Sequence, residues 1–118
     1  MSRLMVWSFL IALGCICLMR PVTAQEKRPE ASTKVVLENE RVRVLDVRIP
    51  PGAQIPMRPR PDRVLYFKQG GKERNAFPDG TTREVESQNG EVRYEKADTR
   101  SIENIGTTEI QVHSVNLK

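Results

Sequence analysis

Arg58 and Arg60 are the residues of this sequence whose type and spacing best suit a binding chemistry. Side chains two residues apart on a β-strand point to the same face, so this pair would form one cationic surface. A guanidinium group can donate two parallel hydrogen bonds to a carboxylate or a phosphate. Tyr66 could add a hydroxyl group to that surface. The pattern indicates a site for a small anion, such as an organic acid or an acidic sugar.

Other reactive side chains are scarce. The single histidine, His113, lies in an apolar stretch, and a lone histidine on a strand is more often structural than a metal ligand. Cys15 and Cys17 both lie near the N-terminus, so the rest of the chain has no thiolate nucleophile, disulfide or cysteine metal site. No pair of titratable groups suggests acid–base catalysis. Catalytic residues and a cofactor are therefore not expected, and a binding role is favoured over an enzymatic one.

The first 24 residues are typical of a secretory signal peptide with its short helix. Arg3 precedes an apolar run over residues 4–19, and small residues lead to a cleavage point after Ala24. The expected location is periplasmic or extracellular. An uncleaved membrane anchor is the alternative, although this run is shorter than the roughly 20 residues that cross a bilayer. Lipidation at Cys15 is a third interpretation.

The remaining chain has the length of one small domain. Residues 25–33 are polar and contain a proline, so they are expected to form a flexible lead-in to a domain over residues 34–118. Removal of residues 1–24 leaves 17 of the 19 basic residues against 15 acidic ones, a net charge of +2. This small excess, without a run of basic and aromatic residues, gives no support to nucleic-acid binding.

The domain shows the alternation and turn signals of an all-β fold. Val42 and Val44, then Val47 and Ile49, alternate with polar residues, and the phase slips near Leu45, which indicates a β-bulge. Further short apolar strands are expected at residues 64–67 and 110–117. Turn signals separate the strands at residues 50–52, 70–71, 77–81 and 89–90, the last being the Asn-Gly pair typical of a hairpin. A small antiparallel barrel or sandwich follows from this pattern.

Two spaced motifs give this barrel a family resemblance. In the first, Gly52 is followed by five residues, then Arg58-Pro59-Arg60, then three residues and Val64, and finally Gly71. In the second, Gly90 precedes a segment that holds Lys96, Asp98, Arg100 and Asn104. The frames of both motifs resemble those of the cupins, small single-domain bacterial members in particular. The resemblance covers about 85 residues and implies a cupin-type β-barrel, or jelly roll.

The departures from the cupin motifs fall at the metal-binding positions. The cupins place histidines where this chain has Arg58, Arg60 and Arg100, and a glutamate where it has Val64. Arginine stays protonated and has no lone pair to donate, so the resemblance implies a barrel that has lost its metal site. It also implies that Arg100 lies near Arg58 and Arg60 inside the barrel. The candidate anion contacts are thus Arg58, Arg60, Arg100 and Tyr66.

Three alternatives remain open at this point. The arginines could reach water at the barrel mouth or pair with neighbouring carboxylates, which would leave a pocket without a ligand; those carboxylates are Asp62, Glu95, Asp98 and Glu103. The domain could serve as a structural or interaction module, for example a homodimer. It could also be a metal-independent enzyme that modifies a sugar or an acid.

Overall fold

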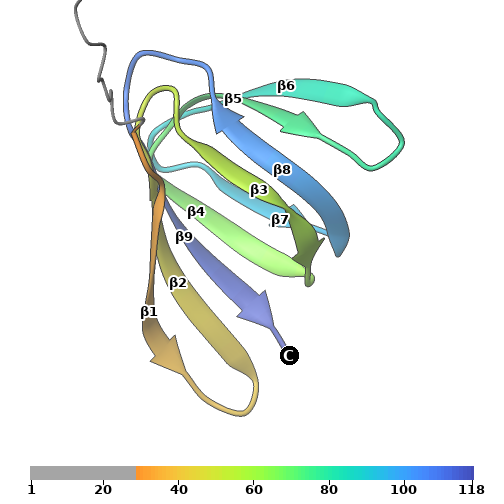
Figure 1. Cartoon of the computed structure of the whole chain (residues 1–118). Coiled ribbons are helices and arrows are strands. Elements are labelled where there is room, and N and C mark those ends of the chain that lie inside the picture. Colours follow the sequence, from red (N-terminus) through yellow and green to blue (C-terminus); the bar gives the residue numbers. More distant parts are fainter. Residues whose placement is uncertain (1–28) are drawn as a thin grey trace, which may run out of the picture.

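The computed structural model describes residues 29–118, which form nine antiparallel strands and no helix (Figure 1). The signal segment expected at residues 1–24 and its helix lie outside the described residues, as do residues 25–28 of the expected lead-in. The first strand begins at Ser32, two residues before the domain start expected at residue 34. The strands, in chain order, are β1 (Ser32–Glu38), β2 (Val42–Ile49), β3 (Gln54–Arg60), β4 (Arg63–Gln69), β5 (Gly71–Ala76), β6 (Thr82–Ser87), β7 (Val92–Glu95), β8 (Asp98–Asn104) and β9 (Ile110–Leu117).

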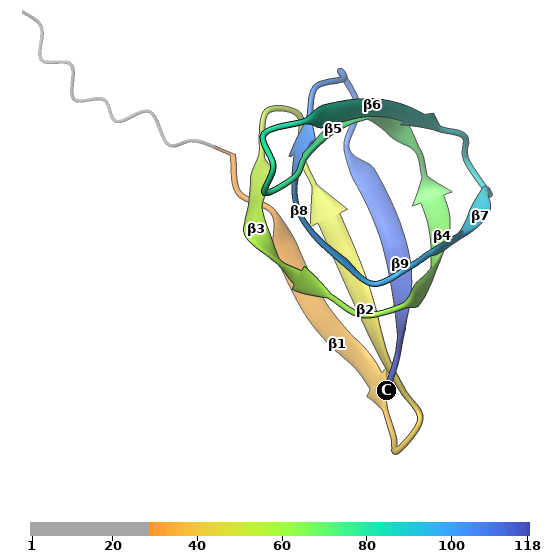
Figure 2. The ribbon, with the colours of Figure 1, turned by 90° about the vertical axis from the view of Figure 1, so that its right-hand side faces the viewer.

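The strands make two sheets that face each other around one interior (Figure 2). A five-stranded sheet has the order β1-β2-β9-β4-β7, and a four-stranded sheet has the order β3-β8-β5-β6. Strands that are neighbours in space are mostly distant in sequence, as expected where the chain crosses repeatedly between two sheets. The all-β barrel expected from the sequence is confirmed. Within residues 29–118 no helix is long and apolar enough to span a bilayer.

Strand β2 corrects one expectation about the sheet. The phase slip near Leu45 is not a bulge in this strand, because all eight residues of β2 pair with β9 in continuous register. Alternate residues that include Leu45, Val47 and Ile49 line the interior, whereas Val42 and Val44 lie on the outer face. The sequence pattern slips because apolar residues change from one face to the other. The irregularity belongs to β1, between Val35 and Leu37.

The two turns expected to be hairpins, at residues 77–81 and 89–90, differ in what they connect. The segment 77–81 is a hairpin turn between β5 and β6, as expected, with Gly80 at a φ of 89° and the Asp79 carboxylate accepting the Thr81 N–H at 2.9 Å. Asn89-Gly90 makes a tight turn with Gly90 at a φ of 84°, but it is not a hairpin. Its flanking strands, β6 and β7, are edge strands of different sheets, so this turn carries the chain from one sheet to the other.

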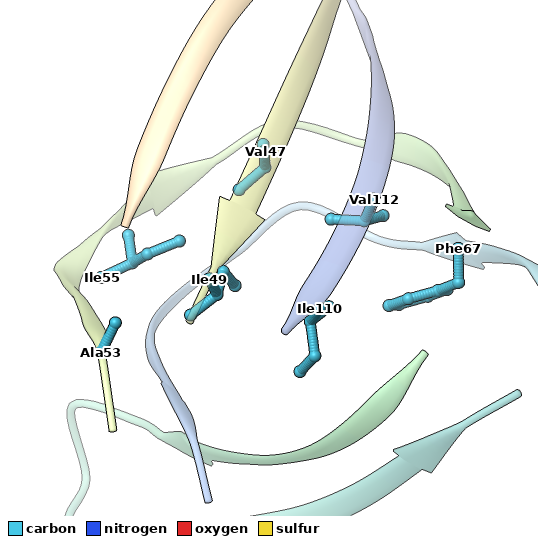
Figure 3. Packing of buried hydrophobic residues seen from close by; sticks show 7 residues of the cluster. All are labelled: Val47, Ile49, Ala53, Ile55, Phe67, Ile110 and Val112. Atoms are coloured by element: carbon cyan, nitrogen blue, oxygen red, sulfur yellow. The ribbon is translucent and has the colours of Figure 1, made fainter. Parts of the chain in front are cut away.

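The apolar core fills one end of the barrel (Figure 3). Seven buried side chains form it: Val47, Ile49, Ala53, Ile55, Phe67, Ile110 and Val112. Asn104, 1% exposed, closes this end with hydrogen bonds from its amide nitrogen to the carbonyl oxygens of Ile49 (2.7 Å) and Thr108 (2.8 Å). Its side-chain oxygen accepts the N–H of Gly106 at 2.9 Å. A single buried amide thus ties together three segments, with its hydrogen-bonding groups satisfied.

Candidate functional site

The inner face of the five-stranded sheet changes character along its length. Cross-strand register places its inward side chains in four successive layers, because residues two apart on a strand share a face. The layers run from the open end to the core as Arg43, Asn116 and Arg63; Leu45, Ser114 and Leu65; Val47, Val112 and Phe67; and Ile49 with Ile110. The barrel is therefore polar and cationic at one end and apolar at the other.

A cavity of about 730 Å³ opens into this interior. Such a volume suits a small organic ligand. Arg58, Arg60 and Arg100 all line it, and Arg58 faces Arg100 directly across the β3–β8 pair. The three arginines predicted from the sequence are thus brought together. Arg63, only 4% exposed, lines the same cavity and was not predicted as a site residue.

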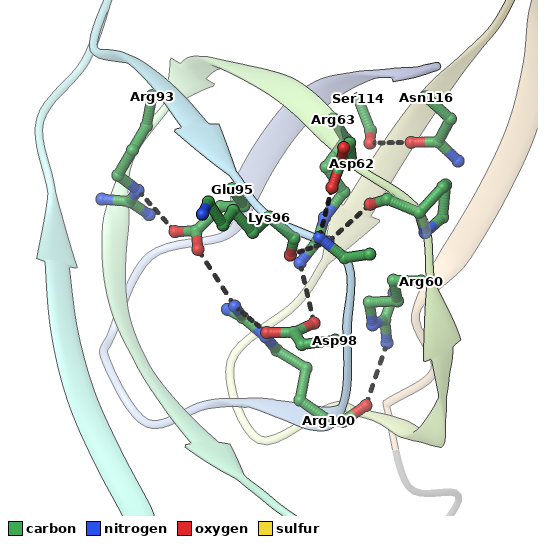
Figure 4. A network of polar contacts seen from close by, with 12 residues as sticks. Arg60, Asp62, Arg63, Arg93, Glu95, Lys96, Asp98, Arg100, Ser114 and Asn116 are labelled. Atoms are coloured by element: carbon green, nitrogen blue, oxygen red, sulfur yellow. Dashed lines mark hydrogen bonds and ion pairs between the residues drawn. The ribbon is translucent and has the colours of Figure 1, made fainter. Parts of the chain in front are cut away.

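Arg63 and Arg100 are held by carboxylates in a chain of ion pairs (Figure 4). The Asp98 carboxylate accepts the Arg100 Nε–H at 2.9 Å and lies 3.5 Å from Nη2 of Arg63. Glu95 joins Arg100, at 3.0 Å, to Arg93, at 3.1 Å. The arrangement alternates in sign across β4, β7 and β8, so each buried charge has an opposite neighbour.

The pKa values follow from these contacts. Burial alone would lower the pKa of Arg100, but its hydrogen bonds to Asp98 and Glu95 outweigh burial and raise it. Burial would likewise raise the pKa of Asp98, yet its hydrogen bond and charge contact with Arg100 lower it. Arg63 has a lowered pKa, caused first by burial and then by the charge of Arg100. Arg100 is therefore firmly bound within the protein and contributes mainly to the framework of the site.

Arg60 is the exception. It forms no ion pair within residues 29–118, and its one side-chain hydrogen bond is a long contact of 3.5 Å from Nη2 to the carbonyl oxygen of Arg100. Its Nε is buried and without a partner there. Burial, followed by the charges of Arg58, Arg63 and Arg100, lowers the pKa of Arg60 to about 10. At neutral pH the group is still charged, so the cavity holds a guanidinium without an ion-pair partner among the described residues, and the charge of Asp98 offsets it only in part.

Tyr66 does not line the cavity. On β4 the inward residues are Arg63, Leu65 and Phe67, so Val64 and Tyr66 face outward. Tyr66 is 41% exposed, and its ring lies 6.1 Å from that of His113 on the neighbouring strand. The expectation that Tyr66 adds a hydroxyl to the arginine surface is wrong by one residue of strand register. Val64, placed at the glutamate position of the motif, likewise does not reach the interior.

Glu73 is a cavity residue that the sequence did not indicate. It lies on β5, is 6% exposed and lines the cavity. Burial raises its pKa above the ordinary value, although the charges of Arg93 and Arg100 oppose the shift. Strand β5 reads Gly-Lys-Glu-Arg-Asn-Ala, with no apolar alternation to show which side faces inward. Only its pairing between β6 and β8 reveals that position.

Comparisons with known proteins agree with this architecture. No family model and no curated protein matches the sequence. Among solved structures, a cupin domain from Bordetella pertussis Tohama I superposes with a TM-score of 0.71 at 25% identity, covering 80% of this chain and 99% of that one. This chain is a member of the cupin superfamily.

Two more distant structures share the cupin fold. An RmlC-like cupin family protein from Methanocaldococcus jannaschii has a TM-score of 0.59 at 18% identity and covers 88% of this chain and 93% of its own. A conserved protein with a double-stranded β-helix domain from Klebsiella pneumoniae has a TM-score of 0.57 at 21% identity, with coverage of 82% and 81%. The jelly-roll barrel is thus the common feature of these proteins.

The residues at the cupin metal-ligand positions do not fit a metal ion. Arg58, Arg60 and Arg100 present only N–H donors, and their positive charges repel a cation. The carboxylates near them, Asp98 and Glu95, are already engaged by arginines. Across residues 29–118 there is no group of three histidine, cysteine or acidic side chains placed to hold a metal. The arginines at these three positions therefore offer hydrogen-bond donors and no metal-ligating atom.

Proposed function

We propose that this cupin domain binds a small anionic ligand in its cavity, with Arg58 and Arg60 as the contacts. The observation that carries the proposal is the environment of Arg60. Withdrawing a charge from water is costly unless it is paired, and the half-buried Arg60 has no ion-pair partner among the described residues although Arg63 and Arg100 nearby have theirs. An anion in the cavity would supply the missing acceptor, including for the unpartnered Nε.

Arg58 and Arg100 have distinct parts in this proposal. Arg58 is exposed at the mouth, directly opposite Arg100, and can turn toward a ligand. Arg100 is fixed by Asp98 and Glu95, so it adds positive potential without changing partners. The ligand would then rest on Arg58 and Arg60, above a rigid ion-pair chain.

Calorimetric titration of the domain with acetate and with inorganic phosphate tests the proposal. Binding should weaken about ten- to hundredfold in Arg60→Gln, as expected for loss of a charged hydrogen-bonding group. The matched control is Arg41→Gln, which removes the same charge from an exposed position in the β1–β2 turn and should leave binding unchanged. Equal affinity in both variants, or no anion binding by the wild type, would refute the proposal.

The N-terminal segment supports a second element of the proposal, export of the domain to the periplasm or the extracellular space. An apolar run followed by small residues up to Ala24 is the pattern that signal peptidase reads. N-terminal sequencing of the product from a cell that expresses the full chain should begin at Gln25. A membrane-bound product that retains residues 1–24, or one that carries lipid on Cys15, would refute cleavage after Ala24 and indicate that the domain is anchored to the membrane.

A specific surface favours homodimerisation as a second candidate function. Register places five apolar residues in one line across the outside of the five-stranded sheet: Leu37, Val44, Val115, Val64 and Tyr94. We name this line the outer apolar row. Tyr94 is 53% exposed and Leu37 51% exposed. An uncharged row of this kind is complementary to itself, because two copies can meet across a two-fold axis without like charges in contact.

Light scattering coupled to size-exclusion chromatography tests the pairing. The wild type should be a dimer at micromolar concentration, and Tyr94→Glu should convert it to a monomer because the row would then bring two like charges together. Thr82→Glu, on the edge strand β6 of the other sheet, is the matched control and should remain dimeric. A monomeric wild type would remove this candidate without affecting anion binding.

A further inference from the structure

Beneath the arginines the cavity wall is apolar on the five-stranded sheet, whereas the buried Glu73 of β5 lines it on the four-stranded sheet. Leu45 and Leu65 occupy the layer below Arg43 and Arg63, and Ile102 follows two residues after Arg100 on β8. All three line the cavity and are only partly buried, so apolar surface remains open toward the cavity. Water against such a wall gains little, and an apolar group that replaces it is favoured.

The same layer offers few partners to a polar ligand. Its one hydroxyl, that of Ser114, already donates to the side-chain oxygen of Asn116 at 2.6 Å. A sugar placed there would bury hydroxyl groups against leucine and isoleucine, which costs free energy when no hydrogen bond replaces those made to water. A small polyanion would leave its second charge against the same apolar wall.

We infer that the ligand is an amphipathic carboxylate, with its head at Arg58 and Arg60 and its hydrocarbon part directed toward the core. The inference rests on the anion site proposed above and adds the ligand class. Two layers, of Leu45 with Leu65 and of Val47 with Val112, lie along the path of the hydrocarbon part. They extend about 13 Å below the arginines, at roughly 3.3 Å per strand residue. A chain of medium length fits this depth.

A homologous series of straight-chain acids measures this directly on the unmodified domain. Acetate, butyrate, hexanoate and octanoate are titrated by calorimetry at constant ionic strength, together with inorganic phosphate and 1-octanol. Each buried methylene group should tighten binding about fourfold until the chain meets the core. Octanoate should therefore bind far more tightly than acetate or phosphate, and 1-octanol should bind poorly because it lacks the charged head.

The outcomes separate the two proposals. If acetate and phosphate bind through Arg60 but octanoate binds no more tightly, the amphipathic ligand is refuted and the anion site stands. If no acid binds, or if 1-octanol binds as well as octanoate, the anion site itself fails. Octanoate binding that grows with chain length and is lost in Arg60→Gln supports both.

Two neighbouring residues on β4 provide a matched pair of variants. Leu65→Asn places an amide in the cavity wall and should weaken octanoate binding about tenfold or more while sparing acetate. Val64→Asn makes a similar change on the outer face of the same strand and should alter neither affinity. Circular dichroism melting of both variants shows whether they fold. If Leu65→Asn does not fold, the chain-length series on the wild type alone decides whether the ligand is amphipathic. Equal octanoate affinity in the two variants would refute the placement of the hydrocarbon chain.

Discussion

Replacing Asp98 by asparagine should destabilise the barrel strongly. Its carboxylate pairs with two arginines that are almost wholly buried, Arg63 at 5% side-chain exposure and Arg100 at 4%. Removing one partner of a buried pair costs about 3–5 kcal/mol, because a buried charge is left uncompensated. Glu95 still holds Arg100 at 3.0 Å and Asp98 is 26% exposed, so we expect a loss of about 2–3 kcal/mol.

A loss of this size is easily measured by thermal unfolding. For a domain of this length it corresponds to a fall in Tm of roughly 8–24 °C. The matched control lies on the same strand. Glu103→Gln breaks a surface pair with Arg74, at 3.3 Å and about 40% exposure on each side, and should cost at most about 1 kcal/mol.

The effect of Asp98→Asn should also depend on pH. The pKa of Asp98 is lowered in the folded protein, so its contribution to stability is complete above the unfolded value of about 3.9 and is lost as the pH falls through the folded value. The Tm difference between the wild type and the variant should therefore be full at pH 6 and narrow below about pH 4. A fall in Tm no larger than that of Glu103→Gln, or a difference constant with pH, would refute the role assigned to this ion-pair chain.

Two further substitutions and one elemental analysis test other parts of the structure. Glu73→Gln should raise Tm at pH 8 and have little effect at pH 4. Because the pKa of Glu73 is raised, the protonated carboxyl group is compatible with the fold below about pH 4.3, and stability is lost as the pH rises and the group ionises. Glu86→Gln, at an exposed position, should show no such trend, and the same Tm gain at both pH values would contradict the reasoning. Gly70→Ala should destabilise the domain markedly in urea unfolding, because its Cβ would lie 2.1 Å from the backbone oxygen of Ser87, and an unchanged midpoint would place these strands farther apart. Elemental analysis of the domain purified without an affinity-tag metal should find well under one transition-metal ion per chain, and EDTA should leave Tm unchanged, whereas stoichiometric metal would overturn the assignment of arginines to the ligand positions.

The fold could be predicted from the sequence because turns and alternation are local signals. The segment 77–81 specifies its turn through residues only a few positions apart, and the final strand, Ile110–Leu117, shows its apolar alternation directly. Sheet membership is not local. Asn89-Gly90 has the composition of a hairpin, but the strands on either side of it lie in different sheets, where β6 pairs with β5 and β7 pairs with β4.

The candidate site was predictable only in part, for a related reason. The motif frame located Arg58, Arg60 and Arg100 because their spacing follows one family pattern. It did not show that carboxylates would pair with Arg100 and leave Arg60 without one, since that depends on which strands meet. Tyr66 was misplaced by one position of register, which is enough to turn a side chain from the interior to the outside.

The apolar residues on the outside of the five-stranded sheet explain why the core could not be identified from the sequence pattern alone. Val42 and Val44 are as apolar as the core residues Val47 and Ile49 farther along the same strand, but they point away from it. Hydrophobic pattern alone does not distinguish a residue that packs in the core from one that belongs to an outer surface.

Asn104 and the arginines lie at opposite ends of the barrel, so the residues that close the fold are separate from those that line the opening. The end closed by the Asn104 amide and the seven core side chains holds the chain in its fold, whereas the arginine end determines what can enter. A change of residue at position 58 or 60 alters the chemistry of the opening while the distant closure stays intact. Such an arrangement allows the residues at the open end to vary while the closed end, on which the fold depends, stays the same.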